Sequence, residues 1–434
     1  MPQSGHSHIL TSLGVRLLRE RAPAVLADAL AAGAELLDLT AAAPAARTPF
    51  VRERQDAELA ALAVRRVVLD DVLRRAALRL PGVTISYGTT VRGLVADASG
   101  RRPAAVVTDT GEHVPADIVL DATGRRAVSR GWAGARGESR TTPTTLRALT
   151  RFYRLTDPGS RPGPLNRGNA AGGIWNHYAA VVHPAEQGLF AVTLGVLPGD
   201  PGTAALRRAG AFTAVAGLSP GVTPWLDRAA ARPVTEVRAI SFPPNTLHPG
   251  PADDGHLDGV LAVGDAACVT DPTYGRGMSL ALVHAFGLAD VLAAHPVPDD
   301  TQRKLAGALA DDLLRPWYEQ AVQDTALRTR AWQAAAGAPA PGPTTATESA
   351  EPTEPPAGRP SLARTAVAAA WDGAVWRGLT RVLMSLDTPA AVFDDPDFRA
   401  RVQAAPPEPP PGTPAPPTRE RLLEAVAAAE GARP

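Results

Sequence analysis

The sequence predicts an α/β protein with a parallel central sheet, an inserted and mostly antiparallel sheet, and a C-terminal helical segment. Three observations support this class. Apolar and polar residues alternate through 82–124 between Gly-containing turns, as in antiparallel strands, and lead into one buried strand at 116–121. Residues 141–240 keep mixed strand signals. Residues 259–294 combine a short apolar strand, a loop and a long helix, as in a parallel α/β sheet.

The N-terminal region before these strands has helical patterns. Residues 11–39 carry apolar residues at helical spacing and predict two short helices, which Pro23 separates and Gly33 ends. Residues 59–80 predict one further amphipathic helix, which ends before Pro81.

The C-terminal region predicts a separate helical segment. One apolar helical face would be formed by Val367, Trp371, Val375, Leu379 and Val382. We expect this face to dock onto the same protein, and the alternative is peripheral contact with a membrane or a partner. A proline run follows Gln403, and a final short helix follows the proline run.

Composition changes along the chain suggest the domain boundaries. We expect an α/β domain in two parts, 1–140 and 241–333, around a substrate-side sheet domain at 141–240. Residues 334–360 are rich in Pro and Ala without periodicity, which indicates a linker, and residues 361–434 form the C-terminal helical segment.

Charge and cysteine content restrict the partners and the compartment. Lys plus Arg and Asp plus Glu both number 44, so no net charge favours nucleic acid. The single cysteine, Cys268, excludes an internal disulfide and fits a reducing compartment. The N-terminus lacks the pattern of a signal peptide, and we find no stretch of roughly 18 apolar residues. We therefore expect a cytoplasmic protein without a transmembrane segment.

The loop inside 259–294 has the composition of a ligand-binding loop. It contains, in order, Gly264, Asp265, Pro272, Gly275 and Gly277. Glycines allow a ligand to approach the backbone, and the helix that follows directs unpaired N–H groups and a positive dipole end toward the loop. Asp265, just past a strand, can accept hydrogen bonds from ligand hydroxyls. These features suit a large cofactor with a polyol chain and a group that becomes anionic.

The passage GDAACVTDPTYGRGMSLALVHA, which begins at Gly264, resembles the GD motif of the para-hydroxybenzoate hydroxylase family. That family includes related halogenases and geranylgeranyl reductases. The resemblance implies a three-layer α/β fold that binds FAD, with Asp265 on the ribityl hydroxyls. It also implies that the amides around Gly277 and Met278 face the pyrimidine edge of the flavin. Cys268 lies in this passage without a His or acid to activate it, so we interpret it as a packing residue.

Two further matches support the resemblance. The segment ADIVLDATGRRA resembles the DG motif of the family, and Asp121 and Gly124 match its Asp-x-x-Gly. In the family this segment lies near the FAD pyrophosphate and the position that NAD(P)H visits. Arg66 resembles the leading residue of a helix that touches the ribityl chain. An Arg at the polar start of an amphipathic helix is also common without a bound ligand. Arg66 could therefore be either a ribityl contact or an ordinary surface residue.

The N-terminal segment carries His6 and His8, but no further ligand stands at a recognisable spacing, so we predict no metal site. The segment resembles a stretch that follows the second strand of the FAD fold in some family members. The glycine-rich turn that grips the dinucleotide would then precede residue 1, and no such turn is present. In order of preference, the explanations are a start codon placed too late, a gene remnant, and a functional variant with a rebuilt cofactor site.

The resemblance implies a monooxygenase that uses FAD, NAD(P)H and oxygen on a small hydrophobic or aromatic substrate. The cofactor carries the chemistry, so no catalytic acid or base is assigned. The substrate pocket would be lined by Tyr153, Trp175, Tyr178 and Phe190, which could instead be core residues. The alternatives are a flavin-dependent reductase, a halogenase, or a non-catalytic remnant unable to hold FAD. The Trp-x-Trp-x-Ile-Pro stretch typical of halogenases is absent from the sequence.

Overall fold

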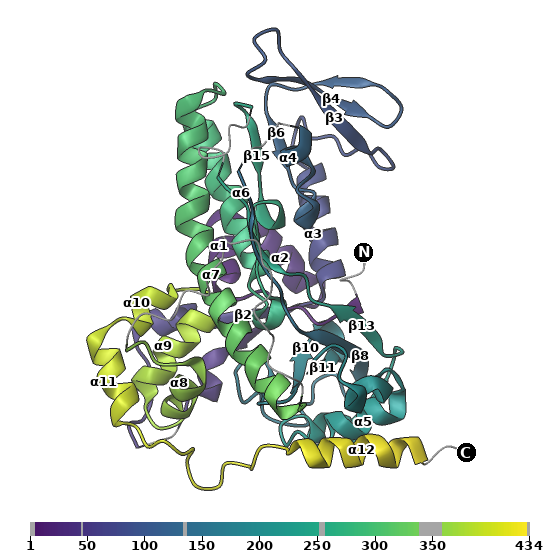
Figure 1. The fold of residues 1–434 in the computed structure, drawn as a ribbon, viewed down its shortest axis with the longest axis vertical. Helices are drawn as coiled ribbons and strands as arrows, with labels where there is room; N and C mark the ends of the chain where they lie inside the picture. The colour runs from purple at the N-terminus through teal and green to yellow at the C-terminus, as the bar shows by residue number, and fades with distance from the viewer. Residues whose placement is uncertain (1–4, 45–46, 133–136, 251–256, 338–357, 432–434) are drawn as a thin grey trace.

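The computed structural model describes residues 5–44, 47–132, 137–250, 257–337 and 358–431. The parts are arranged along one long axis, with a strand hairpin near one end and the inserted sheet near the other (Figure 1). The helices over residues 362–404 lie to one side of this axis, next to α7 (Asp300–Ala335). Most of the expected linker, residues 338–357, lies outside the described residues.

The first two helices agree with the sequence prediction. They are α1 (Ser12–Arg21) and α2 (Pro23–Ala31), with Pro23 in the first turn of the second helix. Gly33, with φ +96°, follows in the left-handed region that favours glycine.

The predicted helix over 59–80 is wrong at its beginning. Residues Ala60–Ala63 form strand β2, which pairs antiparallel with β1 (Glu35–Asp38), and only Arg66–Leu78 is helical, as α3. All four residues of β2 are buried. Alanine and leucine favour helix in isolation, so burial and pairing with β1 override the local preference of this short run.

The parallel part of the fold is a two-stranded pair next to two long helices. Strands β6 (Val119–Asp121) and β15 (Val260–Ala262) are parallel, with Val119 opposite Val260. Helix α6 (Gly277–Ala294) follows and packs against α1 and α7. The expected strand over 116–121 is shorter than predicted and only partly buried, since Leu120 is 47% exposed.

Two small antiparallel sheets accompany this pair. One contains β3 (Val91–Ala96), β4 (Pro103–Thr108) and β5 (His113–Pro115), and it forms the hairpin region at one end of the molecule (Figure 1). The other contains β7 (Arg140–Thr142), β14 (Asn245–Leu247) and β16 (Cys268–Val269). A five-residue helix, α4 (Val128–Trp132), follows the DG motif.

The inserted sheet, predicted to be mostly antiparallel, has six strands, and all its pairs are antiparallel. Its strands are β8 (Arg147–Leu155), β9 (Ala171–Ile174), β10 (Ala179–Pro184), β11 (Leu189–Val196), β12 (Ala231–Pro233) and β13 (Arg238–Ser241). One face packs with α5 (Ala209–Ala216) into a core that contains Phe190, Phe212 and Trp225.

A glycine in β9 makes the pairing of β9 with β10 possible. Gly172 has φ +104°, and a Cβ built on it would lie 2.1 Å from the carbonyl oxygen of Ala180. We expect Gly172→Ala to destabilise the protein by more than about 1 kcal/mol, because the new methyl group meets backbone. Gly210→Ala, at an exposed position of α5 with open space around it, should be neutral or slightly stabilising. Denaturant unfolding of both variants checks this, and equal midpoints would contradict it.

The C-terminal segment forms two helices where the sequence predicted one apolar helical face. They are α8 (Leu362–Ala369) and α9 (Gly373–Leu383), and the short helices α10 (Pro389–Phe393) and α11 (Pro396–Ala404) follow. The chain breaks between α8 and α9 because the Asp372 carboxylate accepts hydrogen bonds from Ala374 N and Val375 N and so caps the second helix.

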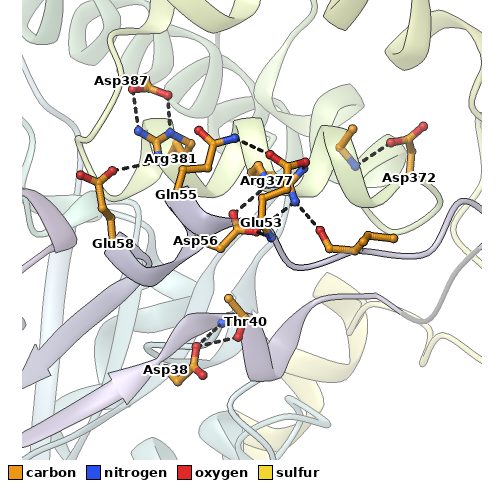
Figure 2. Close-up of polar contacts among 12 residues, drawn as sticks. Asp38, Thr40, Glu53, Gln55, Asp56, Glu58, Asp372, Arg377, Arg381 and Asp387 are labelled. Atoms are coloured by element: carbon orange, nitrogen blue, oxygen red, sulfur yellow. Dashed lines mark hydrogen bonds and ion pairs between the residues drawn. The ribbon is translucent and has the colours of Figure 1, made fainter.

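The C-terminal segment docks onto its own chain, as expected. Val375 and Val382 are buried in a core that also contains Trp317 and Tyr318 of α7. On the polar side of α9, Arg377 reaches Glu53 and Asp56, and Arg381 reaches Glu58 and Asp387 (Figure 2).

The last helix, α12 (Arg419–Gly431), lies apart from α8–α11 (Figure 1). It packs against α5, and its residues Leu422 and Val426 join the core of the inserted sheet. At the start of α12, Arg419 also forms an ion pair with Asp200, at 2.9 Å. The C-terminal end therefore completes a unit built mostly from residues 147–233.

One helix departs from the expectation that no segment could cross a membrane. Helix α6 is long and apolar enough to do so, by length and composition alone. A core helix of a globular fold passes the same test, and α6 packs against α1 and α7.

Candidate functional site

The site begins at the carboxyl end of β15, where the chain turns sharply. Gly264 has φ +62°, and a Cβ on it would lie 3.0 Å from the Cβ of Ala281. The next residue, Asp265, is half-buried, and none of the described residues forms a hydrogen bond with its carboxylate. Burial raises the pKa of Asp265, while the nearby charges of Arg66 and Arg125 counteract this rise. The structure therefore presents an unpaired carboxylate beside two arginines.

The N-terminus of α6 faces this carboxylate. The helix begins at Gly277 without a side-chain cap, so its first N–H groups have no partner within the helix. A Cβ on Gly277 would lie 4.0 Å from Oδ1 of Asp265. Gly275, with φ +65°, supplies the left-handed turn just before the helix. Unpaired N–H groups and a positive dipole end thus lie next to the predicted polyol-binding acid.

The loop between β16 and α6, residues 270–276, is held in place by Asp271. Its Oδ1 accepts hydrogen bonds from the N–H and the hydroxyl of Thr273, at 2.9 and 2.5 Å. Its Oδ2 accepts one from Thr325, at 2.9 Å, and pairs with Arg328. Burial would raise the pKa of Asp271, but Arg328 and Thr273 hold it below its usual value. Pro272 follows in an exposed position at the tip of this loop.

A shallow pocket of about 230 Å³, part of it open to solvent, lies at the same place. It is lined by Gly264, Asp265, Cys268, Thr270, Gly277, Leu280, Ala281 and Leu314. Three of the residues predicted to bind the cofactor therefore share one pocket, while Met278 packs against the core around α1 and α3. Burial raises the pKa of Cys268 to about 12, which fits the predicted packing role.

The structure places the other predicted residues nearby but in different roles. Arg66 begins α3 and pairs with Asp70 at 3.3 Å, and its charge also acts on Asp265. Asp121 is 4% exposed, and its carboxylate accepts hydrogen bonds from Thr123 and Ser129. It therefore fixes the DG loop, where Gly124 has φ +68°. The next residue, Arg125, also acts on Asp265 and was not predicted as a site residue. Its position directly after the DG motif was the one feature of the sequence that pointed to it.

The aromatic residues predicted as substrate lining pack into the core of the inserted sheet. Tyr153 and Phe190 stack at 5.4 Å, and Trp175 and Tyr178 stack at 4.9 Å. Tyr153, Tyr178 and Phe190 are each at most 4% exposed. The opposite face of this sheet carries Thr150 and Thr193, to which the N-terminal segment binds. His6 contacts Thr150 at 2.9 Å, and no group of three or more potential metal ligands occurs among the described residues.

Asp324 of α7 is 7% exposed, and its Oδ2 has no hydrogen-bond partner in the part of the chain that the structure describes. Burial raises the pKa of Asp324 to about 6, although Arg276 and Gln320 act against the rise. The folded state then binds this proton more tightly than the unfolded state, so stability from protonated Asp324 is present near pH 4 and lost as the pH rises through 6.

We expect the free energy of unfolding of the wild type, relative to that of Asp324→Asn, to fall between pH 4 and pH 7.5. Denaturant titrations of both proteins at several pH values measure this difference. A difference that stays constant over the range would show that Asp324 does not titrate there.

Comparison with solved structures places the fold among flavin-dependent monooxygenases and halogenases. A triple mutant of the flavin-dependent brominase Bmp2 matches with a TM-score of 0.54 at 14% identity, over 77% of this chain and 82% of that one. PqsL, a probable FAD-dependent monooxygenase from Pseudomonas aeruginosa, matches with a TM-score of 0.52 at 15% identity, over 76% and 90%. At these identities the likeness establishes the fold alone, and it confirms the predicted fold class.

Among characterised proteins, the chain is similar to kynurenine 3-monooxygenase. The enzyme of Xanthomonas axonopodis pv. citri (strain 306) is 36% identical over 155 residues, which are 34% of this chain and 32% of that protein. The enzyme of Xanthomonas oryzae pv. oryzae (strain PXO99A) is 36% identical over 128 residues, 28% and 27% of the two chains. The chain thus spans about a third of the length of these relatives. No protein-family model matches the chain.

Proposed function

We propose that this protein is a flavin-dependent monooxygenase that uses FAD and NAD(P)H with oxygen on a small hydrophobic or aromatic substrate. The proposal depends mainly on the half-buried carboxylate of Asp265. This carboxylate has no hydrogen-bond partner among the described residues and lies beside the uncapped start of α6. The fold shared with flavin enzymes and the partial similarity to kynurenine 3-monooxygenase support the proposal.

The residues at this site fit the riboflavin half of FAD. A carboxylate without a partner can accept hydrogen bonds from the ribityl hydroxyls. Asp265 lies just past the carboxyl end of β15, which is where open α/β sheets bind ligands. The free amides at Gly277 and Met278 can donate to an electron-rich pyrimidine edge, and the helix dipole favours negative charge there. Gly277 lacks a side chain that would fill the space in front of Asp265. Arg66 and Arg125 add positive charge at the same place.

FAD, once bound and reduced by NAD(P)H, would supply the chemistry that activates oxygen. The protein residues bind and orient. Asp265 and the α6 amides would hold the cofactor, the buried network around Asp271 keeps the loop in place, and Asp121 fixes the DG loop. Each of these contacts is preorganised, so little reordering is needed when a ligand binds.

Titration with riboflavin, followed by the quenching of flavin fluorescence, tests this proposal. We expect Asp265→Ala to weaken riboflavin binding by about tenfold or more, because the ribityl hydroxyls lose a charged acceptor. Asp117→Asn is the matched control, since Asp117 is exposed and outside the site. If the wild-type chain binds no flavin, or if both variants bind it equally well, the proposed function is wrong.

A further inference from the structure

A second and larger pocket lies next to the candidate cofactor site. It has a volume of about 620 Å³, part of it open to solvent, and is bounded by β15, α6, α7 and the end of β14. It shares Leu314 with the smaller pocket and no other lining residue. Its interior is mostly apolar, with contributions from Leu247, Leu261, Leu288 and Ala310.

The buried imidazole of His284 lines this pocket. His284 of α6 is 1% exposed, and its Nδ1 accepts a hydrogen bond from the N–H of Gly264 at 3.3 Å. Its Nε2, on the other side of the ring, is buried and has no hydrogen-bond partner among the described residues. Burial lowers the pKa of His284 to about 4, so the ring is neutral at neutral pH. Since Nδ1 acts as an acceptor, the proton must lie on Nε2, which is therefore a donor with nothing to bind.

The charged residues of the pocket already have partners. Arg130 donates to the carbonyl oxygen of Gly137 at 2.7 Å, and Asp311 pairs with Arg315 one turn further along α7. Asp311 is exposed, so it stands at the mouth and not in the interior. An ionic ligand would thus find no unpaired opposite charge inside, whereas a neutral acceptor would satisfy His284.

We propose that this pocket binds a small neutral molecule with an apolar body and one acceptor oxygen, such as a ketone, through the N–H donor of His284. The apolar wall buries the hydrocarbon part, and the His284 donor fixes the orientation. This site is separate from the proposed flavin site, and the inference holds whether or not flavin binds.

The pocket also touches both motif loops, which suggests that a ligand there affects the flavin site. His284 holds the N–H of Gly264, the residue before Asp265. Ser129, another lining residue, donates its backbone N–H to Asp121 at 2.8 Å. A ligand that favours this arrangement over a looser one would bias the position of Asp265, and by thermodynamic linkage flavin would favour the ligand equally.

Calorimetric titration with cyclohexanone, and with cyclohexane as a matched hydrocarbon, tests the site on the full chain. We expect cyclohexanone to bind the wild type about tenfold or more tightly than cyclohexane does, because only the ketone pairs the His284 donor. Ala310→Leu fills the pocket and should weaken cyclohexanone binding by about tenfold or more. Ala308→Leu, on the exposed side of the same helix, should leave it unchanged.

A third variant keeps the test decisive if Ala310→Leu fails to fold. In His284→Phe the donor is lost while an aromatic ring remains, so the preference for the ketone over the hydrocarbon should vanish. Equal binding of the two probes to the wild type, or undiminished ketone binding by folded Ala310→Leu, would overturn the proposal. Ketone binding without riboflavin binding would instead contradict the proposed function and leave this inference standing.

Discussion

Replacing Arg328 with methionine is expected to lower the free energy of unfolding by about 3–5 kcal/mol at pH 7. The Arg328 and Asp271 side chains are 6% and 1% exposed, so the substitution leaves a buried carboxylate without its cation. The two bonds from Thr273 and the one from Thr325 do not neutralise that charge. Because Asp271 fixes the loop before α6, riboflavin binding should weaken in the same variant.

The matched control is Arg330→Met, two residues further along α7, where the arginine is exposed and surface charges contribute little. In the wild type, the pKa of Asp271 is lower in the folded state than in the unfolded state. The ionised carboxylate therefore stabilises the fold when the pH is above the unfolded-state pKa, and this stability is lost as the pH falls through the folded-state pKa. In Arg328→Met the unpaired carboxylate can protonate, so the deficit should shrink toward pH 4. Denaturant unfolding at both pH values measures it. A loss equal to that of Arg330→Met would show that the ion pair stabilises little.

Replacing Arg377 with methionine should release the C-terminal helices from the α/β part at a cost of about 3 kcal/mol or more. Its guanidinium donates to both carboxylate oxygens of Asp56, at 2.8 and 3.0 Å, and to the carbonyl of Val51 at 2.6 Å (Figure 2). The Asp56 side chain is 0% exposed. Burial would raise the pKa of Asp56, but the bonds from Arg377 keep it below its usual value.

Hydrogen exchange localises the effect of Arg377→Met. We expect faster exchange in α8, α9 and residues 47–58, with little change in the inserted sheet. Arg401→Met is the control, because Arg401 is half exposed and its 3.1 Å pair with Asp372 lies nearer to solvent. If both variants exchange alike, the apolar contacts of α9, and not Arg377, hold the segment in place.

The fold was predictable where several signals coincide. The strand, loop and helix over 259–294 were found because glycines, proline and apolar runs each mark a different element. The strand Ala60–Ala63 was missed because alanine and leucine favour helix, and its pairing with β1 depends on contacts distant in sequence. The break between α8 and α9 was missed because a single Asp372 cap interrupts a continuous apolar pattern.

The candidate site was predictable as a set of backbone positions more than as a set of contacts. Gly264, Asp265 and Gly277 meet in one pocket, as their order around a strand and a helix indicated. The sequence could not show that the Asp121 carboxylate is already bound by its own loop. Nor could it decide which face of the inserted sheet an aromatic residue occupies, because a strand presents alternate residues to opposite faces.

The position of α12 has a consequence for the order of synthesis and folding. The core of the inserted sheet begins with Leu149 and is completed by Leu422 and Val426, so its last pieces leave the ribosome about 180 residues after its last strand. At 5–20 residues per second, this sheet would wait roughly 10–40 s with one apolar surface uncovered. Chaperone demand during translation should therefore depend on the final helix, and a chain halted before Arg419 should be a preferred chaperone substrate.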